Sequence, residues 1–174
     1  MTTYRSDLTY SASSPLPFSA GTPIQDVFSI SGSSSNNISV LKMGISTEII
    51  TAAVKNIVIA KRSSPNIGGT RTLPTVVPYK STNPSGTAVV TEYTAHPTTN
   101  GDFVGYIWSG LIYCPATDSD GTGYAGVEVD FTDMFGQPIT LINENESIAW
   151  NFQGDVIAAG LIISCYVVWT EDPK

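Results

Sequence analysis

Apolar and polar residues alternate along most of this chain, in short runs that end at glycine, proline, serine or asparagine. Successive side chains of a β-strand point to opposite faces, so this alternation predicts half-buried strands. The pattern predicts about eight to ten strands. The clearest span residues 25–30, 38–45, 51–62, 87–94, 103–114, 124–131, 137–142, 147–152 and 160–170. No segment keeps a 3.6-residue period over three helical turns, so the sequence predicts an all-β protein.

The final strand, residues 160–170, has the most apolar pattern in the chain. One face carries Leu161, Ile163, Cys165, Val167 and Trp169; the other carries Ile162, Ser164, Tyr166, Val168 and Thr170. The β-branched residues on both faces favour a strand over a helix. The run is also too short to span a membrane. We therefore expect a central strand covered on both faces, with the first row in the core. In the second row, Ile162, Tyr166 and Val168 are the candidate subunit-interface residues.

The number of strands and the long connections between them predict a single-domain antiparallel β-sandwich of the jelly-roll type, spanning residues 23–174. An immunoglobulin-like sandwich is disfavoured because no tryptophan has the spacing to the cysteines that this fold needs. Residues 1–22 are rich in serine and threonine and contain Pro15 and Pro17. They predict an extended N-terminal arm, which either lies over a neighbouring subunit or frays as a free terminus.

The composition excludes some classes of function. The chain is 41% hydrophobic but only 13% charged, with a net charge of −7, whereas about 25% charged residues is typical. Lys61-Arg62 is the only basic cluster, so we expect no nucleic-acid partner. The N-terminus lacks the basic and apolar regions of a secretory signal, so we expect synthesis in the cytoplasm. Cys114 and Cys165 both lie in predicted strands, either as buried free thiols or as a disulfide.

Four features could carry chemistry. His96 is the single histidine and lies in a turn, which excludes most zinc enzymes. Asp118 and Asp120 precede glycines in a loop that resembles a calcium site but lacks the spacing of an EF-hand; a solvated loop is the alternative. Glu128 and Asp130 share one strand face, either as a glycosidase pair or as solvent-facing residues. The aromatic residues near polar loops are either sugar-stacking groups or residues of the core or of a subunit interface: Tyr106, Trp108, Tyr113 and Tyr124. We expect no catalytic, cofactor-binding or metal-binding residues.

Several short motifs occur in a fixed order. The first group, between residues 59 and 97, consists of Ile59-Ala-Lys-Arg-Ser-Ser, Gly68-Gly-Thr70, Pro74, Val77-Pro78, Pro84, Ala88-Val-Val90, Tyr93-Thr-Ala95 and Pro97. The second group consists of Gln137-Pro-Ile-Thr-Leu and the end of the last apolar strand, Trp169-Thr-Glu171. In this order the chain resembles small virion structural proteins of tailed bacteriophages, over residues 23–171. The resemblance implies a head decoration, fibre or accessory subunit of a phage particle, without catalytic residues.

Three functions follow as expectations. The first is a capsid decoration protein that binds and stabilises the particle. It would bind other copies of itself, as a homo-oligomer with a trimer favoured. It would also bind other virion proteins, such as the major capsid protein. It would be made in the cytoplasm of a bacterial host, and no membrane or cofactor would be involved. The second is a receptor- or glycan-binding domain of a phage fibre or tail. The third is a glycan-cleaving enzyme that would use Glu128 and Asp130.

Overall fold

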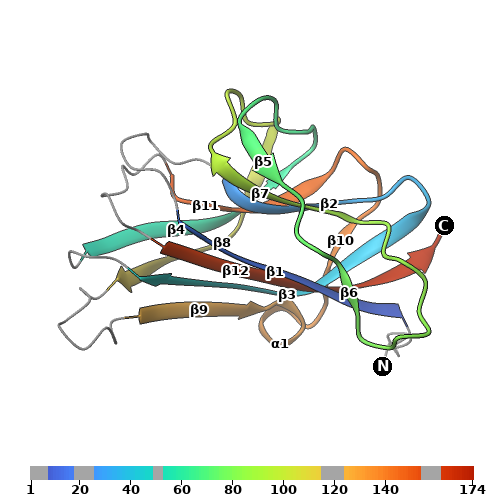
Figure 1. Ribbon diagram of the computed structural model, residues 1–174. Coiled ribbons are helices and arrows are strands. Elements are labelled where there is room, and N and C mark those ends of the chain that lie inside the picture. The colour runs from blue at the N-terminus through green and yellow to red at the C-terminus, as the bar shows by residue number, and fades with distance from the viewer. Residues whose placement is uncertain (1–7, 18–25, 49–52, 115–123, 154–161) are drawn as a thin grey trace.

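Two antiparallel sheets pack face to face (Figure 1). The computed structural model describes residues 8–17, 26–48, 53–114, 124–153 and 162–174. Sheet 1 contains β1 (Thr9–Pro17), β3 (Asn36–Glu48), β6 (Val77–Pro78), β9 (Tyr124–Asp130), β10 (Ile139–Leu141) and β12 (Ile162–Pro173). Sheet 2 contains β2 (Asp26–Ser31), β4 (Ala53–Arg62), β5 (Thr70–Thr72), β7 (Val89–Ala95), β8 (Phe103–Cys114) and β11 (Ser147–Asn151). The predicted all-β sandwich is confirmed.

The strands form four nested antiparallel pairs. Strand β1 pairs with β12, β2 with β11, β3 with β9 and β10, and β4 with β8. This nesting produces the order β1-β12-β3 in sheet 1, with β9 beside β3, and the order β2-β11-β4-β8 in sheet 2. Two Greek keys wound into facing sheets define a jelly roll, so the jelly-roll prediction is also confirmed.

Within the described residues there are twelve strands, because β1, β5 and β6 join the nine that the sequence pattern indicated. The prediction of an arm is wrong for Thr9–Pro17, which pairs along its whole length with β12. Serines alternate there with Tyr10 and Ala12, which are buried. Strand β6 pairs only with the start of β1, so Pro15 and Pro17 lie where β1 is an edge strand and can lack a ladder donor. Residues 1–7 and 18–22 of the predicted arm lie outside the described part of the chain.

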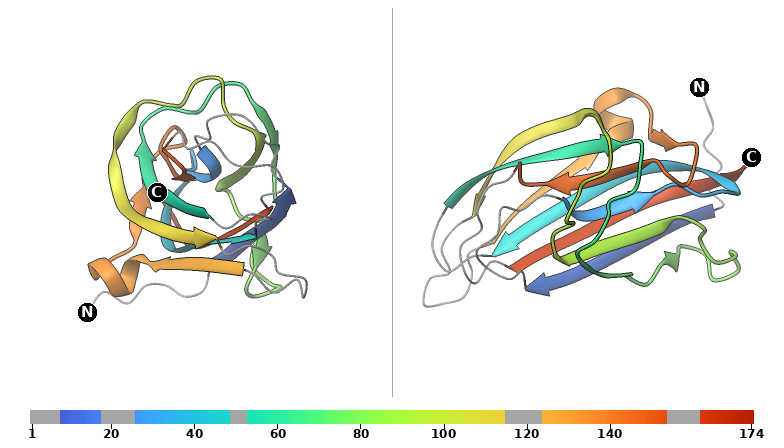
Figure 2. Two further views of the ribbon diagram at one scale, coloured as in Figure 1. Left: turned by 90° about the vertical axis from the view of Figure 1, so that its left-hand side faces the viewer. Right: turned by 90° about the horizontal axis from the view of Figure 1, so that it is seen from above.

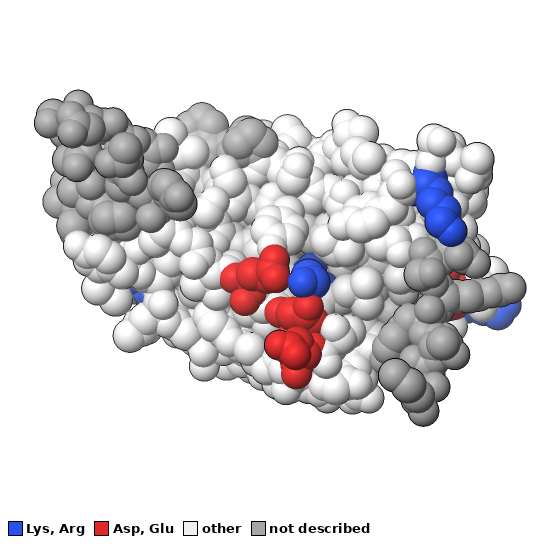
Figure 3. All heavy atoms as spheres, turned by 90° about the horizontal axis from the view of Figure 1, so that it is seen from below, with Lys and Arg blue, Asp and Glu red and all other residues white. Residues whose placement is uncertain are grey.

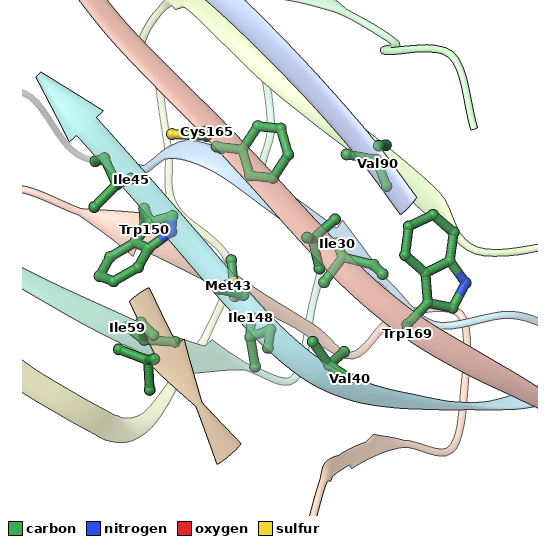
Figure 4. Close-up of a cluster of buried hydrophobic side chains, with 14 of the residues drawn as sticks. Ile30, Val40, Met43, Ile45, Ile59, Val90, Ile148, Trp150, Cys165 and Trp169 are labelled. Atoms are coloured by element: carbon green, nitrogen blue, oxygen red, sulfur yellow. The ribbon is translucent and has the colours of Figure 1, made fainter. Parts of the chain in front are cut away.

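The core lies between the two sheets, where side chains from both point toward one another (Figure 4). The predicted inner row of β12 is confirmed: Ile163, Cys165, Val167 and Trp169 are all buried. Leu161 lies outside the described residues. Fully burying side chains of this size contributes about 1.5–3 kcal/mol each. From sheet 2, Trp150 is also fully buried.

Cys165 is a free thiol buried in the core, and it forms no disulfide bond. The disulfide alternative is therefore wrong. Burial raises the pKa of this thiol well above its usual value, and the nearby Glu92 carboxylate raises it further. Cys165 thus behaves as a small apolar core residue. The side chain of Cys114 lies outside the described part.

Among the described residues, one short α-helix, α1 (Phe131–Phe135), lies between β9 and β10. Its N-cap is Asp130, whose side chain accepts hydrogen bonds from the backbone N–H groups of Thr132 and Asp133, both at 3.0 Å. Its C-cap is Gly136 at φ 72°, a left-handed conformation that glycine adopts easily. Phe131 anchors the helix in the core.

The connection between β4 and β8 adds strands to both sheets. It supplies β7 beside β2, β5 on the far side of β7, and β6 beside β1. In the left view of Figure 2 this green connection arches over β2 and β11. Two buried carboxylates, Asp26 and Glu171, fix it to the sandwich.

The first carboxylate, Asp26, binds Arg62 through two hydrogen bonds, from Nε at 2.6 Å and from Nη2 at 2.8 Å. Asn66 and Asn151 also donate to it, at 2.8 and 2.7 Å. The remaining Arg62 nitrogen, Nη1, donates to the carbonyl of Gly101 at 3.0 Å. Both ends of the connection are therefore held to the outer side of sheet 2.

The second carboxylate, Glu171, accepts hydrogen bonds from Trp169 Nε1 at 2.9 Å and Ala88 N at 3.1 Å. It also accepts from both Thr87 N and Thr87 Oγ1, and from Asn36 Nδ2. Burial by itself would raise the pKa of Glu171, but the hydrogen bonds from Trp169, Thr87, Ala88 and Asn36 outweigh it and lower that pKa. This carboxylate thus ties the segment before β7 to the end of β12.

Candidate interaction surfaces

The outer face of sheet 1 brings together the three residues predicted to lie at a subunit interface. Because opposed residues of paired strands share a face, Tyr166 lies with Ser13, Gly44 and Glu128 in one row. The neighbouring rows hold Val168 on one side and Ser164 and Ile162 on the other. Ile162 is 40% exposed, and Tyr166 and Val168 are half-buried. The described part of the chain therefore leaves this side of β12 partly open, and its cover by a neighbouring subunit stays a prediction.

Small residues make a hollow across this face. Opposed across three strands are Ser164 of β12, Ser46 of β3 and Gly126 of β9. The hollow has a volume of about 550 Å³, and Tyr166 and Glu128 also line it. Short side chains at these positions leave the backbone of the sheet accessible. The outer face of sheet 1 is thus concave at this hollow and not flat.

A charged cluster lies beside the hollow. Lys42 Nζ is 2.8 Å from Asp130 Oδ2 and 3.3 Å from Glu128 Oε1, and the Tyr166 hydroxyl donates a hydrogen bond to Glu128. In the view from below, acidic and basic side chains meet at the middle of a face that is otherwise largely uncharged (Figure 3). Ion pairs this exposed stabilise a fold by about 0–1 kcal/mol. Their main effect is to fix the positions of their side chains.

The pKa values of the cluster follow from these contacts. Hydrogen bonds from Lys42 and then Thr132 lower the pKa of Asp130 to about 2. Hydrogen bonds from Tyr166 and then Lys42 lower the pKa of Glu128. Burial, and then the hydrogen bond to Glu128, raise the pKa of Tyr166 to about 12. At neutral pH both carboxylates are ionised and the phenol is neutral.

Glu128 and Asp130 share a strand face, as the sequence predicted. A glycosidase acid must be protonated near neutral pH, which requires a raised pKa. Both carboxyl groups here have lowered pKa values, and Lys42 binds both of them. The pair therefore lacks the chemistry of a proton donor.

Gly44 positions Tyr166 in this cluster. A Cβ atom at Gly44 would lie 2.0 Å from Cε1 of Tyr166, so the ring rests directly on the glycine. We expect Gly44→Ala to displace the ring and cost about 1–3 kcal/mol, as overpacking does. Because the ring would leave Glu128, the pKa of Tyr166 should fall from about 12 toward its ordinary 10.0. The absorbance of tyrosinate during an alkaline titration, compared with that of Tyr166→Phe, measures this shift.

Gly105→Ala is the matched control for this titration. A Cβ atom at Gly105 would meet nothing within 4 Å, so this variant should leave the titration of Tyr166 unchanged. A Gly44→Ala protein in which Tyr166 still titrates near pH 12 would contradict the described contact.

Strand β8 carries most of the aromatic residues considered for sugar binding. Tyr106 and Tyr113 are 55% and 59% exposed. The ring of Trp108 instead packs edge to face against that of Trp150, with ring centroids 5.7 Å apart. Trp108 is thus partly buried against the core. The side chain of Tyr124 lies outside the described residues. Of the three whose side chains the structure describes, Tyr106 and Tyr113 are therefore available to a ligand.

The other candidate sites add little. His96 is half-buried, and its Nδ1 lies 2.9 Å from the carbonyl of Pro97. The proposed calcium loop around Asp118 and Asp120 lies outside the described residues. In the described ranges, no three histidine, cysteine or acidic side chains group as metal ligands would. No described helix has the length and apolar character needed to cross a bilayer.

Comparisons with known proteins give no family. No protein-family model matches the chain, and no curated protein matches it.

Proposed function

We propose that this protein is a structural subunit of a tailed-bacteriophage virion, most specifically a capsid decoration protein. The observation that carries the proposal is the partly open outer face of β12, a central strand of sheet 1. An antiparallel sheet commonly exposes one face, but that face is then strongly polar. Here it presents Ile162, Val168 and Tyr166 among serines and glycines, with one central charged cluster.

The fold and the composition support the same function. Jelly rolls recur in viral capsid proteins, although they also occur in lectins and other proteins, so the fold alone decides nothing. The low share of charged residues suits a surface that packs against other subunits, because charged residues are depleted in the core of an interface. The short motifs from residue 59 to residue 97 are also similar to those of phage virion proteins.

The mechanism is adhesive rather than catalytic. Copies of the subunit would bind one another, as a trimer, and the major capsid protein through the outer face of sheet 1. A stable seam of this kind buries about 800 Å² on each partner. Binding energy spread along such seams stabilises the assembled shell against the pressure of packaged DNA. The protein would be made in the host cytoplasm and function in the virion.

Substitution in the outer face tests this proposal. Ile162→Asp and Val168→Asp should each break self-association, because an unpaired carboxylate would be desolvated in the seam. Light scattering after size-exclusion chromatography should give an oligomeric mass for the native protein and the mass of one 18.5 kDa chain for the variants. The variants should also lose co-sedimentation with capsids.

Val54→Asp is the matched control, because Val54 is 57% exposed but lies on sheet 2. It should behave as the native protein does. A native protein that stays monomeric at micromolar concentration and does not bind capsids would refute the proposed function.

A further inference from the structure

A second hollow lies on the other sheet, over the ladder formed by β4 and β8. Its volume is about 420 Å³, which is within the range of small-molecule sites. The lining residues that matter here are Asn56, Val58, Tyr106, Ser109, Leu111 and Gln153. Strand β11 pairs with β4 only as far as Asn151, opposite Val58. The hollow thus occupies the place where β11 stops and the other two strands continue.

One side of this hollow is aromatic and apolar. Tyr106 is 55% exposed and Leu111 is 66% exposed. The ring of Phe103 packs against that of Tyr106, with centroids 4.7 Å apart and planes tilted by 58°. This contact restrains the tyrosine ring before any ligand arrives, which reduces the entropy lost on binding.

The other side offers neutral polar groups. Asn56, Ser109 and Gln153 are all exposed, and within the described part of the chain their side chains have no recorded hydrogen bond. The backbone N–H of Gln153 donates to Asn151 Oδ1 at 2.6 Å, and Asn151 is itself bound to the buried Asp26. The backbone that carries Gln153 is therefore attached to the buried network, while its side chain remains free for a ligand.

The chemistry of the lining selects the class of ligand. The residues around the hollow carry no charge, which disfavours phosphates, nucleotides and charged peptides because nothing would neutralise them. A pyranose ring has one face of C–H bonds, which pack on an aromatic ring, and a rim of hydroxyls, which bond amides and serine. The combination of Tyr106 with Asn56, Ser109 and Gln153 matches both parts of such a ring.

Addition of a partner strand to β8 explains these features less well. The β4–β8 ladder has two register shifts, between Ile59 and Ala60 and between Lys61 and Arg62. Such bulges twist an edge strand and discourage pairing with another chain. The free amide and hydroxyl groups would also have no role in strand addition, which uses the backbone.

We propose that this hollow binds a neutral sugar unit, a hexose or an N-acetylhexosamine, of a polysaccharide. Tyr106 stacks on the sugar ring, and the two amides and the serine hydroxyl bind its hydroxyl groups. The site lies on the sheet opposite to the proposed subunit interface, so sugar binding and assembly are separate properties of the two sheets.

Saturation-transfer NMR with a panel of neutral mono- and disaccharides of glucose, galactose and N-acetylglucosamine tests this site. At least one sugar should receive saturation from the native protein. Tyr106→Ala should weaken its binding by at least about tenfold, a loss of about 1.4 kcal/mol. Asn56→Ala should weaken it by about threefold or more, as expected when one hydrogen bond is lost.

Tyr113→Ala is the control, since Tyr113 is equally exposed on the same strand but lies outside the hollow. It should leave sugar binding unchanged, and thermal unfolding should show that all three variants are folded. Absence of saturation transfer to every sugar in the panel overturns the proposal, as does an equal loss in Tyr113→Ala. Pairing of β8 with an added peptide strand, without sugar binding, also overturns it. Tyr106→Ala should still bind capsids, so failure here is distinguishable from failure of the proposed function.

Discussion

Arg62→Ala is expected to lower the free energy of unfolding by about 3–5 kcal/mol, because it leaves the carboxylate of Asp26 buried without its cation. The side chain of Asp26 is 0% exposed and that of Arg62 is 5% exposed. Asn66 and Asn151 would still donate to Asp26, but neutral donors do not replace a positive charge. Denaturant unfolding followed by tryptophan fluorescence measures the loss.

The geometry of this pair makes a sharper test possible. Arg62 meets both oxygens of Asp26 and also the carbonyl of Gly101. Lysine has a single ammonium group and cannot make this fork of parallel bonds. Arg62→Lys should therefore recover only part of the stability lost in Arg62→Ala. The control is Arg71→Ala at an exposed position of β5, which should stay within about 0.5 kcal/mol of the native protein. A loss below about 1 kcal/mol in Arg62→Ala would contradict the described network.

Glu171→Ala is expected to cost about 3 kcal/mol. The change leaves two buried donors, Trp169 Nε1 and Ala88 N, without an acceptor. Each buried donor that loses its partner costs about 1–3 kcal/mol. The exposed Glu144 provides the control, as Glu144→Ala, because its carboxylate makes no hydrogen bond or ion pair with the described residues. Equal stability of the two variants would contradict the role assigned to Glu171.

Glu171 also predicts how stability depends on pH. Its pKa is lowered in the folded protein from an ordinary value of 4.5. The stability from its ionised form is therefore present above pH 4.5 and is lost as the pH falls through the folded pKa. Glu171→Gln has no charge to lose, so its deficit relative to the native protein should be largest at pH 7 and smaller near pH 3. A deficit that does not change with pH would contradict this assignment.

The sequence predicted the sandwich because local patterns determine its strands. In β12, alternation at Ile163, Cys165, Val167 and Trp169 placed one row in the core without information from elsewhere in the chain. Strand β1 was missed for a local reason as well. Its serines and two prolines are typical of a loop, and only pairing with β12 makes them a strand.

The buried networks could not be predicted, because their members are far apart in the sequence. Asp26 and Asn151 are separated by 125 positions, and Glu171 and Thr87 by 84. One signal was available: Glu171 directly follows the apolar run predicted as a strand at residues 160–170, where an acidic residue needs a partner if it is buried. The sequence did not identify that partner.

The candidate surfaces were predicted in part. Ile162, Tyr166 and Val168 do share one face, because the two-residue period of a strand requires it. Their neighbours on that face, such as Lys42 and Glu128, depend on the register of β12 with β3 and of β3 with β9. Register between distant strands is set by the whole sheet, so neither the hollow nor its charged cluster could be derived beforehand.

The most direct test of the proposed function is an electron cryomicroscopy map of intact virions of the phage that encodes this protein. We expect ordered copies on the capsid, with the outer face of sheet 1, including Ile162 and Val168, against a neighbouring subunit. Virions that lack the protein, or copies whose outer face of sheet 1 is open to solvent, would contradict the proposal.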